Sequence, residues 1–489
     1  MLAALTSGLR RDADRPAFLG RGQVTRGELA DLADGYAAAL YHDYGLGPGD
    51  PIGVAVRPGA RAVAVMLAAY RLGLQVVVLD PTAGPEVLRS RLARVAPRLI
   101  LADAAAQAVA GWAAPLARRA HLALPDLESL GPVVTVGPRL PGCAPPLSPV
   151  HRPVPDHRDH AGDAVVIFTS GTTSRPRAVV HTRASLNAGL RAVRDLVEPI
   201  PGQPVLGGTF FVLLPALAAG APVVLPARST RQLVRQLRRF QPQATYLTPP
   251  VLRDVLAAGG RFTGRVWTGS APASASLLGR VRQAGAEQAW GVYALTELFP
   301  AAAVEAREKQ AFREAGDLVG ALLPGVRGRV DETGQVWLTG PSACHRYLGE
   351  APQPWVATGD LGRFDAQGRL VLAGRCKDMI LRRAENIYPG LYEPLLHVPG
   401  VDLAVLVGVP DSEGDERLVA LIQLAPGADP TWVRAALERP LARMGAATPD
   451  VVRFTTIPLA GRSRKPDRAA AARLAATLIA DTEARQETR

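Results

Sequence analysis

The chain has 489 residues, of which 48% are hydrophobic and 20% charged, and its 56 lysines and arginines against 44 acidic residues give a net charge of +12. This length favours two or more domains, and the large hydrophobic share excludes a disordered chain. Aromatic residues are only 5% and the basic residues are spread along the chain, so no nucleic-acid partner is expected, although a mild attraction for anionic substrates is.

The first part of the chain alternates between strand-like and helix-like segments. A short hairpin and a helix are expected within residues 20–50. Strands at Ile52–Val56, Gln75–Leu79 and Arg98–Leu101 then alternate with helices at Ala60–Leu72 and Pro85–Val95. This order is typical of βαβ units and predicts a largely parallel sheet. The Pro- and His-rich stretch Pro141–His160 lacks periodicity and is predicted to be a linker or loop.

The alternation resumes after residue 180 and later gives way to hairpins. Helices are predicted at Ala184–Leu196, Thr230–Arg239, Val251–Ala257 and Ser274–Ala284, and strands at Pro222–Leu225, Ala244–Leu247 and Arg265–Trp267. Hairpins follow at Arg329–Leu338 and Arg363–Leu372, then strands at Ala404–Val409 and Leu418–Leu424, a helix at Thr431–Arg443 and an Ala-rich C-terminal helix. The expected fold class is α/β, with a large N-terminal α/β domain of two sheet subdomains plus a β-hairpin-rich part, and a small C-terminal α+β domain.

Cysteine usage and hydropathy indicate the cellular compartment in which the protein is expected. Cys143, Cys344 and Cys376 form no C-x-x-C pair, which indicates neither a disulfide framework nor a zinc site. The N-terminus lacks the apolar region of a signal peptide. The uncharged run Val205–Pro226 is long enough to span a bilayer, but its glycines and prolines favour a buried helix followed by a strand. We therefore expect a soluble, cytoplasmic protein with no membrane partner.

A hydroxyl-rich turn interrupts two apolar runs near residue 170. The strand-like run Ala164–Phe168 ends in Thr169, Ser170, Gly171, Thr172 and Thr173, and Arg175 and Arg177 follow. Small hydroxyl residues around a glycine let the backbone approach a polyanion, and the arginines add positive charge. The pattern is not a Walker loop, because its glycine spacing differs and no helix follows. It predicts a phosphate-binding loop, and the alternative is an ordinary Ser/Thr-rich turn.

This stretch resembles the phosphate loop of the adenylate-forming superfamily, which comprises acyl-CoA synthetases, peptide-synthetase adenylation domains and luciferases. The usual pattern is T-S-G-T-T-G-x-P-K-G, from which the chain departs at Ser174, Arg177 and Ala178. Five further stretches resemble superfamily motifs in the usual order: residues 268–272 (G-G-A-P), 293–297 (Y-G-x-T-E), 355–362 (W-x-x-T-G-D-L-G), 374–380 (G-R-x-x-D-x-I) and 464–468 (G-K-x-x-R). The resemblance covers essentially the whole chain.

The resemblance implies a role for each matching residue in binding ATP and Mg²⁺. Thr169 to Thr173 and Arg177 would hold phosphates, while Gly269, Ser270 and Ala271 would leave room for adenine or the acyl group. Tyr293 would lie near adenine, Thr296 would contact the α-phosphate, and Glu297 would bind Mg²⁺, which prefers carboxylate and phosphate oxygens. Ala294 stands where glycine is usual.

The later motifs would complete the site. Asp360 would accept both ribose hydroxyls, and Arg375 would contact ribose or phosphate. Lys377 would be the hinge between an N-terminal domain, residues 1–375, and a small mobile C-terminal domain, residues 376–489. Lys465 would be the lysine of the adenylation step, although Arg464 precedes it where glycine is common.

The implied reaction is ATP-dependent activation of a small carboxylic acid as an acyl adenylate with release of pyrophosphate, then transfer to coenzyme A. One alternative passes the adenylate to an amine or another small nucleophile, and another is a degenerate, non-catalytic nucleotide-binding protein. The coenzyme A ligase pattern S-G-G-E-N is replaced by residues 382–386, R-R-A-E-N. These side chains either block the passage for pantetheine, or their arginines meet coenzyme A phosphates.

The segment at residues 206–221 aligns with the family's acid-binding helix. Gly208 stands where amino-acid-activating domains carry an aspartate, so an ordinary α-amino acid is disfavoured because no carboxylate would pair its ammonium group. Phe210, Phe211, Val212 and Leu213 would form an apolar wall suited to an aryl or alkyl acid, with His181 as a further pocket residue. The alternative is that these residues simply pack the core.

Overall fold

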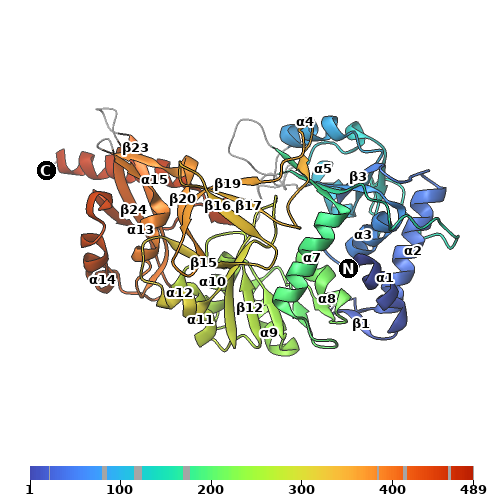
Figure 1. Cartoon of the computed structure of the whole chain (residues 1–489), viewed down its shortest axis with the longest axis horizontal. Coiled ribbons are helices and arrows are strands. Elements are labelled where there is room, and N and C mark those ends of the chain that lie inside the picture. The colour runs from blue at the N-terminus through green and yellow to red at the C-terminus, as the bar shows by residue number, and fades with distance from the viewer. Residues whose placement is uncertain are drawn as a thin grey trace.

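The computed structural model describes residues 1–20, 22–79, 85–114, 124–168, 177–382, 385–410, 416–460 and 464–487. In Figure 1 the N-terminal and middle segments form a large body, and the last hundred or so residues form a smaller one at the opposite end. We call residues before 376 the large lobe and residues 380–487 the small lobe. The predicted fold class, mixed α/β with a large N-terminal and a small C-terminal part, is confirmed.

The first sheet of the large lobe is the predicted parallel one. Its seven strands lie in the order β18 (Arg346–Tyr347), β8 (Ala178–Thr182), β7 (Asp163–Phe168), β4 (Gln75–Val78), β3 (Pro51–Ala55), β5 (Leu99–Ala102) and β6 (Val133–Thr135). The pairs from β7 to β6 are parallel, whereas β8 lies antiparallel to β7. The two strands that flank the predicted phosphate loop therefore pair directly with each other.

The second sheet holds both the remaining parallel strands and the hairpins. Its thirteen strands lie in the order β16 (Arg327–Val330), β17 (Gln335–Thr339), β19 (Val356–Phe364), β20 (Arg369–Arg375), β15 (Asp317–Leu322), β14 (Ala302–Glu305), β13 (Gln288–Tyr293), β12 (Arg265–Thr268), β11 (Ala244–Tyr246), β9 (Val205–Leu206), β10 (Val223–Val224), β1 (Pro16–Leu19) and β2 (Val24–Thr25). Both predicted hairpins, β16–β17 and β19–β20, are present. They extend this sheet rather than forming a separate layer.

Helices cover both sheets. Those of the large lobe are α1 (Leu2–Arg11), α2 (Arg26–His42), α3 (Ala60–Leu72), α4 (Pro85–Val95), α5 (Ala104–Ala110), α7 (Arg183–Val197), α8 (Phe210–Ala218), α9 (Thr230–Phe240), α10 (Pro249–Ala257), α11 (Ala275–Gln283) and α12 (Ala306–Ala311). The apolar run at 205–226 forms β9, α8 and β10, so the predicted buried helix and strand are confirmed, with one further strand before them. Within the described ranges, no helix combines the length and apolarity that a bilayer span requires.

The small lobe is built around a three-stranded sheet, β23 (Val401–Pro410), β24 (Glu416–Leu424) and β25 (Val451–Phe454). Side chains alternate along β23: Ala404 and Leu406 enter one apolar core, and Leu403 and Val405 enter another on the opposite face. The other elements are β21 (Ile380–Arg382), β22 (Glu385–Ile387), α13 (Pro389–Tyr392), α14 (Pro430–Ala442), β26 (Leu459–Ala460), β27 (Lys465–Pro466) and α15 (Arg468–Glu487). This body thus has its own core.

Candidate functional site

Tyr293, Asp360 and Arg375 form a hydrogen-bonded group that we call the polar cluster. The Tyr293 hydroxyl donates to Asp360 Oδ2 at 2.5 Å, and Arg375 Nε lies 2.9 Å from Asp360 Oδ1. Asp360 is 4% exposed, and its burial raises its pKa, with the charge of Arg375 opposing the shift. Burial and the charge of Asp360 raise the pKa of Tyr293 well above its ordinary value, so its hydroxyl stays a donor.

The local backbone explains why the T-G-D string holds the Asp360 carboxylate opposite Arg375. Asp360 on β19 lies directly opposite Arg375 on β20, so the two side chains face each other across an antiparallel pair. Thr358 Oγ1 donates to the carbonyl of Val336 at 2.7 Å and accepts from the backbone N–H of Asp360 at 3.1 Å. Gly359 between them has φ 70°, which glycine adopts without strain.

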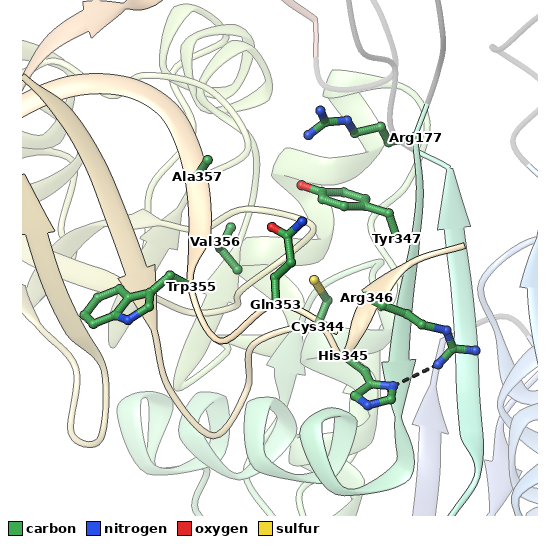
Figure 2. A pocket seen from close by; sticks show the side chains of 9 residues that line it. All are labelled: Arg177, Cys344, His345, Arg346, Tyr347, Gln353, Trp355, Val356 and Ala357. Atoms are coloured by element: carbon green, nitrogen blue, oxygen red, sulfur yellow. Dashed lines mark hydrogen bonds between the residues drawn. The ribbon is translucent and has the colours of Figure 1, made fainter. Parts of the chain in front are cut away.

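Glu297 lies beside a second group of polar side chains. The Tyr347 hydroxyl donates to Glu297 Oε1 at 3.1 Å, and the guanidinium of Arg177 lies 4.7 Å from the centre of the Tyr347 ring. Figure 2 shows Arg177 and Tyr347 together at one end of a small pocket. The strand pairing of β18 with β8 brings Tyr347 to Val179, two residues beyond Arg177. The chain that follows the predicted phosphate loop therefore reaches the predicted magnesium ligand.

The same pocket contains a thiol, which its surroundings keep inert. Cys344 is buried, and its backbone N–H donates to the carbonyl of Glu297 at 2.6 Å. Burial, followed by the charge of Glu297, raises the pKa of the Cys344 thiol to about 12. A thiol that stays protonated is a poor nucleophile, so Cys344 is not suited to covalent catalysis.

His181, Phe211 and Phe299 form what we call the aromatic cluster. The Phe299 ring lies 5.5 Å from the His181 ring and 4.4 Å from the Phe211 ring, measured between centres. His181 is fully buried, and its Nε2 donates to the carbonyl of Thr296 at 2.7 Å. Burial lowers the pKa of His181, so the imidazole is neutral near pH 7. Phe211 is 37% exposed, which leaves its ring accessible to another molecule.

The glycine that the sequence analysis singled out has space around it. Gly208 lies between β9 and α8, and a Cβ there would approach Pro226 Cδ to 3.4 Å, an ordinary contact. A Cβ on the neighbouring Gly207 would approach Val212 Cγ1 to 2.6 Å, which requires a shift. Packing therefore does not exclude a side chain at Gly208. Phe210, the first residue of α8, packs against the main core.

Two positions where the superfamily pattern has glycine keep a left-handed backbone here. Ser270 has φ 67° and Arg464 has φ 46°. A non-glycine residue in this region costs roughly 1–2 kcal/mol. The Ser270 hydroxyl lies 3.1 Å from the Tyr246 hydroxyl, and a Cβ on Gly269 would lie only 3.0 Å from the Val292 carbonyl oxygen, so both residues sit in a tight turn. The left-handed backbone of Arg464 is one that glycine favours, as expected if Arg464 stands at the motif's glycine, and the register of Lys465 stays a prediction.

Lys465 lies within electrostatic range of the polar cluster. The residue as a whole is exposed, yet the pKa of its ammonium group is lowered, first by desolvation and then by the charges of Arg375 and Lys377. The charges of Asp378 and Asp360 oppose this shift. Five of the predicted stretches therefore lie near one another in the fold. They are the stretches that contain Tyr293 and Glu297, Asp360, Arg375, Lys465 and Arg177.

Some of the predicted site residues lie outside the described residues, and Arg382 has other contacts than those expected. Thr169 to Thr173 of the predicted phosphate loop are not described, and of that loop only Arg177 is placed. Arg382 is 8% exposed and contacts Asp450 and the Thr448 carbonyl, so it is engaged within the small lobe. Arg383 and Ala384 lie outside the described residues.

Sequence reasoning missed two members of the site. Tyr347 lies on a strand fifty residues away from Glu297, and the sequence around it does not predict the contact between them. Phe299 follows the Y-G-x-T-E match by two residues and links His181 to Phe211. Its closeness in sequence to Glu297 was a usable signal.

The chain is similar to known proteins over most of its length, both in sequence and in fold. A model of the AMP-binding enzyme family matches residues 5–348. The chain is 28% identical to the olefin beta-lactone synthetase of Stenotrophomonas maltophilia over 86% of this chain and 85% of that protein. It is also 28% identical to the sulfoacetate–CoA ligase of Cupriavidus necator over 91% of each. The amide bond synthetase McbA from Marinactinospora thermotolerans superposes with a TM-score of 0.78 at 26% identity, covering 96% of this chain and 99% of that one.

Proposed function

The chain belongs to the AMP-binding enzyme family, and we propose that it is a ligase that uses ATP to activate a small carboxylic acid as its acyl adenylate. A carboxylate oxygen attacks the α-phosphorus, the bond from that phosphorus to pyrophosphate breaks, and an acyl adenylate remains. The observation that carries this proposal is the polar cluster with Lys465 beside it. A buried carboxylate and a guanidinium form one hydrogen-bonded group with an ammonium group within electrostatic range, and a nucleotide needs ribose acceptors and phosphate donors of these kinds.

Each residue has a role that follows from its surroundings. Asp360 is held by Tyr293 and Arg375, and each of its oxygens retains a lone pair for a ribose hydroxyl. Lys465 supplies positive charge to the oxygens on which negative charge grows in the transition state. We assign phosphate contacts to Thr296, Arg177 and the loop Thr169–Thr173, and the walls of the adenine and acyl site to Gly269, Ser270, Ala271 and Tyr293.

The donor set around Glu297 fits a Mg²⁺ ion that accompanies a nucleotide. Mg²⁺ is commonly held by one or two carboxylates together with phosphate oxygens, and it would neutralise phosphate charge here. Glu297 is half-buried, and Tyr347 fixes one of its oxygens by a hydrogen bond. Tyr347 therefore orients the carboxylate, and Arg177 against its ring brings a second positive charge to the same side.

We place the domain boundary at residues 375/376, with Lys377 as the hinge. The small lobe has its own two apolar cores, and a short 3-10 turn, Cys376–Asp378, joins it to β20. Rotation about this connection would withdraw Lys465 and admit the second substrate. The acyl group then passes to the acceptor, and AMP leaves.

Coenzyme A is the proposed acceptor, and an amine is the second candidate. The likeness to the sulfoacetate–CoA ligase over 91% of both chains supports the first. The likeness to an amide bond synthetase favours the second, and so does the ion pair of Arg382 with Asp450, which occupies an arginine that could otherwise contact a coenzyme A phosphate. The proposed acid is aryl or alkyl, since Gly208 offers no carboxylate and Phe211 presents an exposed ring.

The proposal is tested by acid-dependent release of pyrophosphate, with a panel of aryl, alkyl and α-amino acids. Wild type should release pyrophosphate with at least one apolar acid, and Lys465→Ala should lower the rate by about 10²–10³. Mass spectrometry of products formed with coenzyme A, amines or neither then identifies the acceptor. Equal rates in the two proteins would remove Lys465 from the reaction, and no release with any acid would favour a non-catalytic nucleotide-binding protein. Location in the cytoplasm stays a prediction, which cell fractionation would check.

A further inference from the structure

Asp402 joins the two lobes through a buried charge contact. It lies at the start of β23 in the small lobe and is 8% exposed. Its Oδ1 accepts a hydrogen bond from Arg280 on α11 at 3.3 Å and lies 3.4 Å from Arg253 Nε on α10. Both arginines belong to the large lobe, whose helices α10 and α11 lie toward the small lobe in Figure 1. Gln423 of the small lobe donates to the other oxygen of Asp402 at 3.1 Å.

A second contact between the lobes uses the adjacent residue of α10. Arg464 of the small lobe lies 2.7 Å from Asp254, and both side chains are largely exposed. Arg464 directly precedes Lys465, and its left-handed backbone fixes the direction in which the chain enters β27. Exposed ion pairs contribute little to stability, whereas removing one partner of a buried pair is costly because it leaves charge uncompensated. The contact of Asp402 with Arg253 and Arg280 is therefore expected to stabilise this arrangement of the lobes more than the contact of Arg464 with Asp254 does.

These contacts act on the position of Lys465. In this arrangement of the lobes Asp402 contacts Arg253 and Arg280, and Arg464, the residue before Lys465, contacts Asp254. The charges of Asp360 and Arg375 reach Lys465 in the same arrangement. Burial lowers the pKa of Arg253, and the charge of Asp402 is the largest influence opposing that shift, which agrees with a close and enclosed pair.

We propose that Asp402, held between Arg253 and Arg280, is a positioning residue that clamps the lobes in the arrangement that delivers Lys465 to the adenylation step. This inference rests on the proposed function for its kinetic consequence. The clamp must open before the small lobe rotates for acyl transfer, so it favours the first half-reaction and opposes the second. Its loss lowers the population of the adenylation arrangement, and with it the rate of pyrophosphate release.

The decisive variant is Asp402→Asn, with two matched controls. Asp450→Asn removes a carboxylate that pairs with Arg382 and accepts from the backbone N–H of Leu418, both of which belong to the small lobe. Arg464→Gly removes the exposed contact to Asp254 while glycine keeps the left-handed backbone. Arg280→Gln breaks the clamp from the large lobe and serves if Asp402→Asn fails to fold.

The first measurement needs no substrate. A dye pair on cysteines introduced at the exposed positions Ile200 and Trp432, in a Cys376→Ser background, reports the distance between lobes by energy transfer. We expect Asp402→Asn and Arg280→Gln to broaden the distribution, Arg464→Gly to change it slightly, and Asp450→Asn to leave it as in the wild type. An unchanged distribution in the two clamp variants, or the same change in Asp450→Asn, overturns the clamp.

The second measurement is pyrophosphate release, with ATP and the acid that gives the fastest release in the panel above. Asp402→Asn should lower kcat about tenfold while the KM for ATP stays within about twofold, because the nucleotide-binding residues are intact. A change in the KM for ATP with kcat unaltered would overturn the positioning role. If the wild type releases no pyrophosphate, the proposed function fails together with this kinetic consequence, while the energy-transfer measurement still decides whether the clamp exists.

Discussion

The polar cluster and the aromatic cluster lie at opposite ends of one short segment and are stabilised by different forces. Tyr293 begins the segment and joins Asp360 and Arg375 through hydrogen bonds and charge. Phe299 ends it and joins His181 and Phe211 through ring contacts. Between them, Thr296 offers its carbonyl to His181, so the segment connects a charged region to an apolar one.

This contrast separates two kinds of specificity. A nucleotide presents hydroxyls and phosphates that do not vary, and the side chains that meet it are limited to particular acceptors and donors. An acid pocket is recognised by shape and apolar contact, for which many side chains serve. Changes in the polar cluster should therefore alter ATP use with every acid, and changes in the aromatic cluster should alter which acid is used.

In the comparison of the two clusters, the largest effect is expected for Asp360→Asn. Loss of charged hydrogen bonds to ribose should lower kcat/KM for ATP by about 10- to 100-fold with every acid. Stability should change by less than about 1 kcal/mol, since burial already disfavours the ionised carboxylate and the half-exposed Arg375 is then solvated. Thermal melts and ATP kinetics check the two parts. A loss of folding equal to the loss of activity would show that the carboxylate is structural.

A smaller and acid-dependent effect is expected for Phe211→Ala. Removing a ring that is 37% exposed should raise the KM for an aryl acid about tenfold and leave the KM for ATP unchanged. Phe210→Ala, on the same helix but packed against the core, is the control and should act on stability. If both variants change acid and ATP use alike, the division between the clusters does not hold.

The pH dependence tests Lys465 on the polar side. Its pKa is lowered from 10.5, so the ammonium loses its proton at a lower pH than an ordinary lysine, and pyrophosphate release should fall as pH rises through that pKa. Because the pKa of Lys465 is lower in the folded protein than in the unfolded chain, the fold disfavours the charged form. The free energy of unfolding should therefore rise with pH as Lys465 loses its proton. Lys465→Arg should move the alkaline limb of the rate profile to higher pH, because a guanidinium stays charged. An unmoved limb would assign it to another group.

The smallest effect is expected at Gly208. Gly208→Ala should change the free energy of unfolding by less than about 0.5 kcal/mol, whereas Gly207→Ala should cost about 1–3 kcal/mol because its Cβ meets Val212. Denaturant titration of the two variants measures the difference. If Gly208→Ala folds and Gly208→Asp abolishes use of apolar acids, the position lines the acid pocket. Retained use after Gly208→Asp would place the pocket elsewhere.

Local patterns predicted the elements and much of the polar cluster. Helices α3 and α4 begin and end at the predicted residues, since their apolar spacing and flanking glycine and proline signals are local. Tyr293, Asp360 and Arg375 were predicted from the resemblance to superfamily motifs, and the structure brings these three side chains together, while the roles of these residues and of Lys465 stay predictions. The helix α1 was not predicted, and the order of strands around β1 could not be, because pairing between strands two hundred residues apart has no local signature.

Contacts that depend on packing were the ones that sequence reasoning missed. Phe299 and Tyr347 act through neighbours that only the folded chain brings close. Gly208 was singled out for lacking a carboxylate, but only the structure shows that the position has room for a Cβ. Arg464 and Ser270 stand where the motifs have glycine, and only the structure shows that both have the left-handed backbone that glycine favours.

The parallel pairing of β1 with β10 has a practical consequence for anyone shortening this protein. Arg26, buried just after β2, donates to the carbonyl of Leu217 on α8, and the backbone N–H of Leu2 donates to Asn187 on α7. Deleting residues 1–26 would turn β10 into a bare sheet edge and uncover α8, which carries Phe210 and Phe211. A shortened chain that begins after β2 is therefore expected to lose support for the helix that carries these two rings.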